Sequence, residues 1–200
     1  MARPVVHTST LRDELLSVAA DLVDRNGPAK ITVRDVAAAA GTSTTAVYSL
    51  FGGKSELLAA VVDDGFRSFG SSQEAALKDG LRGLGIAYRH WALSHPALYR
   101  LMFGGALASF AECLPSPDAT TDAMGPLKEA VTAAQPAEGR LAAPVEIIAA
   151  AIWGQVHGLV SLELAQVGPP GMDWDAAYDA ALEAIARSWT IPVASNPSMG

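Results

Sequence analysis

The segment formed by residues 33–51, VRDVAAAAGTSTTAVYSLF, constrains the fold of this chain more than any other stretch. Its first apolar residues recur at the spacing of one helical face, and Gly41 follows them, a residue type that commonly ends helices. The hydroxyls of Thr42 and Ser43 are suited to capping a second helix over the remaining residues of the segment. Two short helices joined by a tight turn form a helix-turn-helix, whose second helix enters the major groove of DNA.

The composition allows a large buried core. Of the 200 residues, 50% are hydrophobic and 18% are charged, which permits one large domain or two small ones and argues against disorder. The single cysteine, Cys113, excludes an internal disulfide, and no N-terminal apolar run resembles a signal peptide. These two features predict a cytoplasmic protein. Charged and polar residues interrupt the longest apolar stretch, at 145–165, so we expect no membrane span.

The net charge of −7 at first argues against binding to nucleic acid. The charges are unevenly distributed, because residues 1–54 hold six basic and five acidic side chains while the rest of the chain carries the whole acidic excess. DNA affinity depends on which charges reach phosphates rather than on the total. The distribution therefore permits a DNA-binding N-terminus on an acidic body.

Two Thr-x-x-Asp patterns predict where the first helices begin. Thr10 precedes Asp13, and apolar residues follow at helical steps until the sequence Asn-Gly-Pro ends the run. Thr32 precedes Asp35 in the same way and opens the helix-turn-helix. Residues 1–9 show no apolar period, and we expect them to form a flexible arm. We expect the first helix to pack across the helix-turn-helix and complete a three-helix domain.

The middle of the chain is predicted as three helices. Lys54 opens a long helix that Gly70 is expected to stop. Ser71 and Glu74 form another capping box, and a stripe of apolar and aromatic residues follows at alternating steps of four and three. Pro96 suits the first turn of a short helix. The stripe consists of Leu77, Leu81, Leu84, Tyr88, Trp91 and His95.

The last part of the chain is predicted as three helices separated by loops. The first occupies residues 123–134, and the second, at 144–165, is apolar almost all round, which implies burial on two sides. Asp173 is expected to cap the third helix, which is followed by a frayed tail. We expect loops at 112–122, 135–143 and 168–171, and the tail at 191–200.

Strand alternation, solenoid-length repeats and metal-type cysteine pairs are absent from the sequence. It therefore predicts an all-α fold of about nine helices, with an N-terminal helix-turn-helix domain at residues 1–54 and a C-terminal helical domain at residues 55–200. We expect no metal and no cofactor, because His90 and His95 lie about 140° apart around a helix. No motif clusters a nucleophile, a base and an orienting acid, so no catalytic residues are predicted and the chain is not expected to be an enzyme.

Polar side chains around the second helix of the motif are candidate DNA contacts. Thr44, Thr45 and Ser49 face outward there, where short hydroxyls can contact base edges. Tyr48 and Lys54 suit phosphate oxygens. Arg34 and Thr32 are expected to add contacts to the DNA backbone. Arg3, in the arm, is placed to reach the minor groove. The predicted DNA-binding set is Thr32, Arg34, Thr42, Ser43, Thr44, Thr45, Tyr48, Ser49 and Lys54.

Each of these residues also has a purely structural interpretation. Tyr48 and Phe51 can be core aromatics of a small helical domain, and Lys54 can be an ordinary surface lysine. Thr42 and Ser43 cap a helix whether or not DNA is bound. The joint spacing of these residues favours the DNA-binding interpretation.

Aromatic and soft apolar residues in the second domain predict a small-molecule pocket, with His157 as a polar group on a buried helix. The alternative is that this cluster is ordinary core, since aromatic stripes at helical spacing usually are. Gly154 and Gly158 lie one helical turn apart and permit close helix approach, which fits a dimer interface or a tightly packed core. The predicted ligand-binding residues are Tyr88, Trp91, His95, Tyr99, Met102, Phe103, Trp153 and His157.

Residues 11–58 resemble the DNA-binding domain of the tetracycline-repressor (TetR) family of bacterial regulators. The resemblance is carried by ITVRDVAAAAGTSTTAVYSLF and the following GGKSELL. It implies a C-terminal helical domain that binds small molecules and forms a homodimer through its last two long helices. RHWALSHPALYRLMFG and IWGQVHGLVSLEL further resemble the subgroup named for its Trp, His and Gly, here Trp153, His157 and Gly158.

The segment departs from the family pattern within the second helix of the motif. A basic residue and a glycine are frequent in the family where Thr44 and Thr45 stand, and an aromatic residue or histidine where Ser49 and Leu50 stand. The segment therefore identifies the class of protein better than the DNA sequence that it binds.

The predicted function is a ligand-responsive regulator that binds double-stranded operator DNA as a homodimer. The resemblance implies a repressor released from a palindromic operator by a small-molecule effector, which would tilt the helix that begins at Lys54. The alternatives are a helical small-molecule-binding or catalytic protein without DNA affinity, and a helical module that binds a protein partner.

Overall fold

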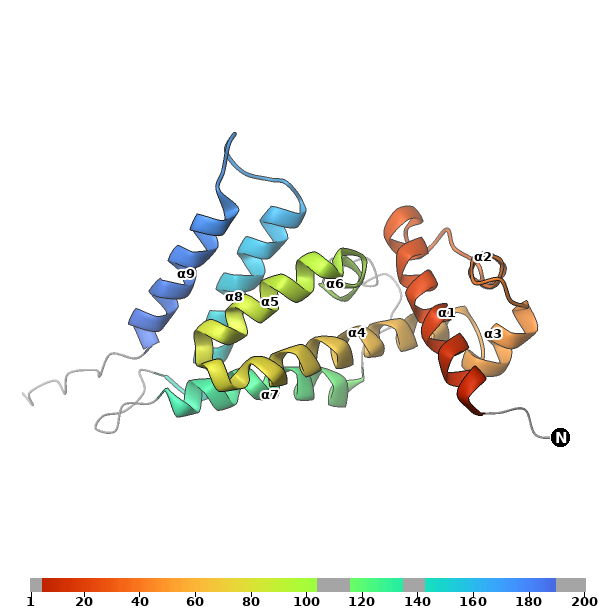
Figure 1. The fold of residues 1–200 in the computed structure, drawn as a ribbon, viewed down its shortest axis with the longest axis horizontal. Helices are drawn as coiled ribbons and strands as arrows, with labels where there is room; N and C mark the ends of the chain where they lie inside the picture. Colours follow the sequence, from red (N-terminus) through yellow and green to blue (C-terminus); the bar gives the residue numbers. More distant parts are fainter. Residues whose placement is uncertain (1–4, 104–115, 135–142, 190–200) are drawn as a thin grey trace, which may run out of the picture. The chain divides into compact units, whose positions relative to one another are not determined.

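The structure, a computed structural model, describes residues 5–103, 116–134 and 143–189. In these ranges helices are its only regular secondary structure, with nine α-helices and one short 3-10 helix, so the predicted all-α class is confirmed (Figure 1). The elements are α1 (Val5–Asn26), α2 (Val33–Ala39), α3 (Thr44–Phe51), α4 (Lys54–Ala76), η1 (Leu77–Asp79), α5 (Gly80–Ser94), α6 (Pro96–Phe103), α7 (Pro117–Ala133), α8 (Val145–Leu164) and α9 (Trp174–Trp189).

The chain divides into two compact units, and the division falls inside α4, after Ser68. The first unit combines residues 1–68 with residues 95–120, and the second combines residues 69–94 with residues 121–200. The boundary predicted between domains 1–54 and 55–200 lies earlier in the chain, at the start of α4. The first unit also includes α6, because α6 packs against α1, a contact between segments distant in sequence. As a division of functions, the predicted boundary stays a prediction.

The core of the first unit is built from α1, α2, α3 and the first part of α4. Leu15, Val36, Val47 and Leu58 are each completely buried. Apolar burial of this kind contributes most of the stability of short helices, which are marginal in isolation. On α6, Phe103 stands edge-on to Phe66 of α4 with ring centroids 5.6 Å apart. An ion pair between Arg100 and Asp24, with Nη2 and Oδ2 2.7 Å apart, joins α6 to α1.

The core of the second unit lies between α5, α8 and α9, which pack side by side (Figure 1). Its buried residues come from one face of each helix, as the periodic stripe in α5 predicts. They include Leu84, Tyr88, Ile148, Ile152, Val160, Tyr178, Leu182 and Ile185.

The helix predicted at 144–165 forms as α8, and it meets the length and composition expected of a membrane span. By themselves these two properties are weak grounds for a membrane span, because core helices also meet them. In the single chain, only one side of α8 is buried rather than the two predicted. Ile147 is 58% exposed and Leu162 is 44% exposed on the other side.

The predicted start of the first helix is wrong. The helix α1 begins at Val5, so Thr10 lies inside it and does not form a capping box with Asp13. A hydroxyl residue is tolerated inside a helix when packing of the apolar face determines where the helix runs. Of the predicted arm, residues 1–4 lie outside the described residues.

The predicted stop at Gly70 and the capping box of Ser71 and Glu74 are also wrong, because α4 continues to Ala76. A Cβ atom at Gly70 would lie 3.5 Å from the Cα of Ala123, an ordinary van der Waals distance, so this part of α4 packs beside α7. The chain turns instead at Gly80, whose φ of +63° favours glycine.

The helix predicted at 123–134 begins earlier, at Pro117, so residues 117–122 are not a loop. The hydroxyl of Ser116 accepts from the N–H of Ala119 at 3.3 Å and caps this helix. Proline is accepted at the first helical position, but Pro126 lies inside α7. Residues 112–115 of the predicted loop at 112–122, most of the loop predicted at 135–143 and the predicted tail lie outside the described residues, as does Cys113.

Candidate DNA-binding and ligand-binding sites

The turn between α2 and α3 is held by caps that the sequence predicts. The Thr32 hydroxyl accepts from the N–H of Asp35 at 3.2 Å, while the Asp35 carboxylate accepts from the N–H of Thr32 at 2.8 Å. Hydrogen bonds from the side chain and then the backbone of Thr32 lower the pKa of Asp35. At α3, the hydroxyl of Ser43 accepts from the N–H of Ala46 at 3.2 Å. Gly41 ends the preceding helix with a φ of +62°, which completes the helix-turn-helix.

The helix α3 is anchored on one side and exposed on the other. Val47 is completely buried, whereas Tyr48 is 55% exposed. This exposure excludes the interpretation of Tyr48 as a core aromatic. Thr45 and Ser49 are exposed on the same helix, and Thr44 is half-buried. The outward side of α3 therefore presents hydroxyl and phenol groups, which can hydrogen-bond to base edges and phosphate oxygens.

The other predicted DNA-binding residues surround α3. Thr32 and Arg34 are exposed, and Thr42 is half-buried beside the cap at Ser43. Lys54, also half-buried, donates from Nζ to the carbonyl oxygen of Ala29 at 3.2 Å. This hydrogen bond ties the start of α4 to the turn before α2, a structural role that the sequence pattern did not reveal. The predicted minor-groove contact, Arg3, lies outside the described residues.

The predicted ligand-binding residues fall into both compact units and do not form one cluster within either. Tyr88, Trp91, Trp153 and His157 belong to the second unit, and the other four belong to the first. In the first unit, His95 is exposed between α5 and α6, whereas Tyr99 and Phe103 pack together with ring centroids 5.1 Å apart. Met102 lies beside Gly65 of α4, where its sulfur would meet an added Cβ at 2.7 Å.

The second unit contains a cavity of about 30 Å³. Two predicted residues, Tyr88 and Trp153, line it. Trp91 does not line it, but stands edge-on to Phe69 with ring centroids 5.4 Å apart. The cavity is lined by Phe69, Gln73, Leu81, Leu84, Gly85, Tyr88, Ala123, Met124, Leu127, Ile152, Trp153, Val156, Leu182 and Ile185.

None of the other lining residues was predicted as a ligand contact. The periodic stripe of α5 marks Leu81 and Leu84 as inward-facing, but periodicity does not distinguish a cavity wall from packed core. Gln73 was missed because the preceding helix was expected to stop at Gly70. Met124 was missed because residues 123–134 were predicted only as a helix, with no role in the pocket.

A chain of polar contacts joins α5 and α8 beside the cavity. The indole N–H of Trp153 donates to the Tyr88 hydroxyl at 3.3 Å, and the Tyr88 hydroxyl lies 3.0 Å from Nδ1 of His157. Nε2 of His157 lies 3.4 Å from the hydroxyl of Ser161. Burial lowers the pKa of His157, which favours the neutral imidazole. The neutral ring can therefore accept from Tyr88 on one side.

Among the described residues, Gln73 is the only buried polar or charged residue when tyrosine and tryptophan are counted as aromatic. With its amide oriented to satisfy both groups, its nitrogen donates to the Leu84 carbonyl and its oxygen accepts from the Tyr88 N–H, each at 3.2 Å. The amide is thereby committed to the backbone of α5.

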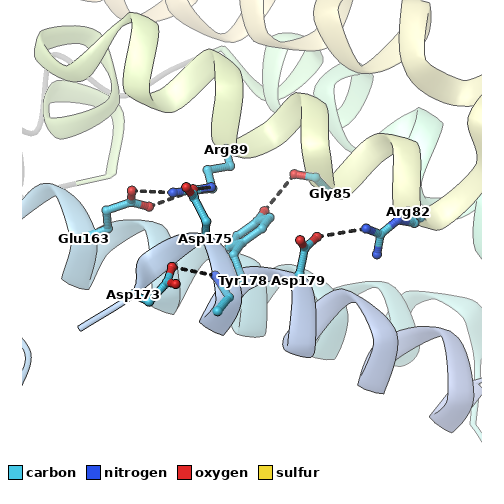
Figure 2. A network of polar contacts seen from close by, with 9 residues as sticks. Arg82, Gly85, Arg89, Glu163, Asp173, Asp175, Tyr178 and Asp179 are labelled. Atoms are coloured by element: carbon cyan, nitrogen blue, oxygen red, sulfur yellow. Dashed lines mark hydrogen bonds and ion pairs between the residues drawn. The ribbon is translucent and has the colours of Figure 1, made fainter. Parts of the chain in front are cut away.

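A cluster around Arg89 fixes α5 to α8 and α9 (Figure 2). Its guanidinium donates twice to Glu163, at 2.7 and 2.8 Å, and pairs with Asp175 at 2.6 Å. These contacts raise the pKa of Arg89, and the hydrogen bonds to Glu163 make the largest contribution. The guanidinium also lies over the ring of Tyr178, whose hydroxyl donates to the carbonyl of Gly85 at 2.8 Å. No sequence signal predicts this cluster, because its members are far apart in the chain.

The fold and the exposed α3 together define a class of protein, namely a helix-turn-helix regulator of transcription with a second helical unit that encloses a cavity. Residues 15–61 match the family model described as bacterial regulatory proteins of the tetR family, and residues 81–185 match that of the tetracyclin repressor-like C-terminal domain. The chain belongs to the TetR family. It is a ligand-responsive, DNA-binding transcriptional regulator and not an enzyme.

Solved structures share the fold across nearly the whole chain. PfmR, a TetR-family regulator from Thermus thermophilus, is 22% identical over 88% of this chain and 98% of its own, with a TM-score of 0.64. FadR, a fatty acid degradation regulator from Bacillus halodurans, is 14% identical over 88% and 94%, with a TM-score of 0.71. A TetR-family regulator from Marinobacter aquaeolei is 18% identical over 88% and 95%, with a TM-score of 0.67. The comparison with curated proteins gave no match.

Proposed function

We propose that a homodimer of this chain represses transcription in the cytoplasm by binding a palindromic operator, and that a small molecule releases it. The observation that carries the proposal is the outward side of α3, where Tyr48 is 55% exposed while Val47 anchors the helix. In this arrangement, α3 enters the major groove and reads bases with Thr44, Thr45 and Ser49.

Phosphate contacts position the helix in the groove. We assign them to Tyr48, Lys54 and Arg34, with Thr32, Thr42 and Ser43 at the two helix N-termini. The Thr32 hydroxyl is already engaged with Asp35, since it lies 2.7 Å from Oδ2, so its contact with DNA would be secondary. The short hydroxyls of α3 make fewer base contacts than arginine would. The residues that contact phosphates therefore carry much of the affinity for DNA.

The exposed side of α8 supports dimerisation through the last two long helices. Residues on this side recur at steps of four and three, and the small ones leave room for close approach of another helix. An added Cβ at Gly154 or Gly158 would meet no atom within 4 Å. Exposed alanines of α9, at Ala176 and Ala180, extend the surface. The stripe on α8 consists of Ile147, Ala151, Gly154, Gly158 and Leu162.

Coupling between ligand and DNA would run through α4. This helix begins at Lys54, next to the helix-turn-helix, and its last part contributes Phe69 and Gln73 to the cavity wall. A ligand that binds more tightly when the last part of α4 is in one position would shift the equilibrium between the DNA-bound and DNA-free states. The predicted ligand contacts Tyr88, Trp153 and His157 lie at or beside this cavity.

The test is selection of bound sequences from a random DNA pool by the full chain, followed by fluorescence anisotropy on the enriched sequence. We expect a palindromic sequence, bound by two chains, with affinity that falls steeply as salt rises. A helical ligand-binding protein without DNA affinity, the alternative function, predicts that no sequence is enriched even at low salt.

A further inference from the structure

The described residues that line the cavity in the second unit carry no charged side chain. Among the described residues, none of those lining it is an aspartate, glutamate, lysine, arginine or histidine. Three lining residues carry a polar side-chain group, namely the amide of Gln73, the hydroxyl of Tyr88 and the indole N–H of Trp153. Each has a partner in the fold, since Gln73 pairs with the backbone of α5 and Trp153 donates to Tyr88.

A charged ligand has no counter-charge at this wall. Moving a carboxylate or an ammonium group from water into such a site is costly unless an opposite charge or several hydrogen bonds replace its hydration. His157 contacts Tyr88 from behind the wall, and burial keeps its imidazole neutral near pH 7 by lowering its pKa. Apolar surface, in contrast, gains from burial against the leucine, isoleucine and aromatic side chains there.

The cavity must grow to hold such a ligand. Its volume of about 30 Å³ suffices for a small number of water molecules, and small-molecule pockets are on the order of ten times larger. The walls formed by α5, α8 and α9 are packed together and joined by Arg89 (Figure 2). They are therefore poor candidates for movement.

The wall formed by α7 is built differently. Pro126 lies inside this helix, where it removes one backbone hydrogen bond. Met124 and Leu127, which line the cavity, are on either side of the Gly125-Pro126 pair, and both are half-buried. Among the described elements of the second unit, α7 also packs less extensively on its neighbours than α5, α8 and α9 do on one another.

We propose that the cavity binds an uncharged, largely apolar small molecule, and that α7 moves outward around Pro126 to admit it. The inference rests on the proposed role of this cavity as the effector site. It deepens that role by assigning the chemical class of the effector and the wall that yields to it.

The test compares three competitors with ten-carbon chains, whose head groups are neutral, negatively charged and positively charged. The full chain is titrated with N-phenylnaphthylamine, an uncharged probe whose fluorescence rises in apolar sites, and the bound probe is displaced near neutral pH by decanol, decanoate or decylammonium. Decanol should compete at a concentration about tenfold lower than either ion, because only the ions lose hydration without a counter-charge. Failure of the probe to bind, or equal or better competition by either ion, would overturn the proposal.

A lysine substituted into the cavity wall tests whether the probe and its competitors bind in this cavity. Met124→Lys should reverse the preference, so that decanoate competes about tenfold better than decanol. Met172→Lys is the matched control, because Met172 is exposed and does not line the cavity, and it should leave the preference unchanged. If circular dichroism shows that Met124→Lys does not fold, Leu127→Lys replaces it. A folded lysine variant with the unchanged preference for decanol would show that the binding lies elsewhere.

Hydrogen exchange tests the movement of α7 directly. In the chain without ligand, backbone amides of α7 should exchange at least about tenfold faster than those of α8, and decanol should change the exchange of α7 more than that of α8. Equal protection of the two helices would overturn the assignment of α7 as the moving wall. Anisotropy of operator DNA in the same samples separates the two proposals, because decanol that binds without weakening DNA affinity contradicts effector release and leaves the ligand class standing.

Discussion

At the residue scale, the exposure of Tyr48 and the hydrogen bond of Lys54 separate two roles that the sequence pattern assigned together. Tyr48 points to solvent from α3, so its phenol is available to DNA. Lys54 binds the carbonyl of Ala29 and also carries a charge next to the helix-turn-helix. A phenol donates one hydrogen bond to a phosphate, whereas an ammonium group that neutralises a phosphate also releases a counterion from the DNA. The two residues should therefore affect DNA binding in different ways.

Tyr48→Phe should weaken operator binding about fivefold for each subunit, because it removes one hydrogen bond of about 1 kcal/mol. It should leave the salt dependence unchanged. Lys54→Ala should weaken binding to all sequences and lower the slope of log affinity against log salt by about 0.9 for each subunit. Anisotropy titrations across a salt series measure both effects. Lys78→Ala, which removes an exposed lysine of the second unit, is the control and should change neither quantity.

The ion pair between Asp24 and Arg100 predicts a pH dependence of stability. The hydrogen bond from Arg100 lowers the pKa of Asp24 below the ordinary value of 3.8. The pair therefore stabilises the fold fully above pH 3.8, and this stabilisation is lost as the pH falls through the lower folded pKa. Since both side chains are partly exposed, Asp24→Asn should cost about 1 kcal/mol at neutral pH.

Denaturant unfolding of Asp24→Asn and the unchanged chain over a pH series measures this difference. The two free energies of unfolding should converge as the pH falls below the folded pKa of Asp24. A difference that stays constant down to the lowest pH would mean that the carboxylate charge is not its source.

At the element scale, α7 shows how a helix can contain a residue that ends most helices. Pro117 begins the helix at a position where its missing N–H is not needed, whereas Pro126 interrupts the hydrogen bonds inside it. The sequence-based prediction placed the start of this helix at Ala123, shortly before Gly125 and Pro126, which both disfavour helix. Packing of Ala123, Ala130 and Val131 on the second unit outweighs that preference.

Pro126→Ala should stabilise the chain, by up to about 3 kcal/mol, because alanine restores the missing hydrogen bond and suits a helix interior. It should also weaken binding of the apolar probe if α7 must bend to admit a ligand. Thermal unfolding and probe titration measure the two effects. Pro117→Ala is the matched control, since proline is already suited to that position, and a similar gain from both variants would argue against a special role for Pro126.

At the scale of the whole molecule, α8 links the composition of one helix to assembly. Its apolar side chains are sufficient for burial on two sides, but the single chain covers only one. Ile147 and Leu162 remain exposed on the uncovered side, and the glycines between them leave space above the backbone. A second copy of the chain would cover this surface in the proposed dimer.

Gly158→Leu should disrupt that dimer while leaving the single chain folded, since a Cβ atom added at Gly158 meets no atom of another element within 4 Å. Analytical ultracentrifugation should show a shift to monomer, and operator affinity should fall with it. Ala75→Leu, on an exposed part of α4, is the control and should remain dimeric. A Gly158→Leu variant that stays fully dimeric would exclude this face as the interface.

The sequence by itself determined the helical class, the helix-turn-helix and its caps, because these depend on spacings within a few residues. The capping box at Thr32 and the turn at Gly41 follow from such local patterns. Only the tertiary structure decided which aromatic residues line the cavity, that α4 passes through Gly70, and that Arg89 joins three helices. These features depend on contacts between segments far apart in the chain, and periodicity within one helix carries no information about its partner.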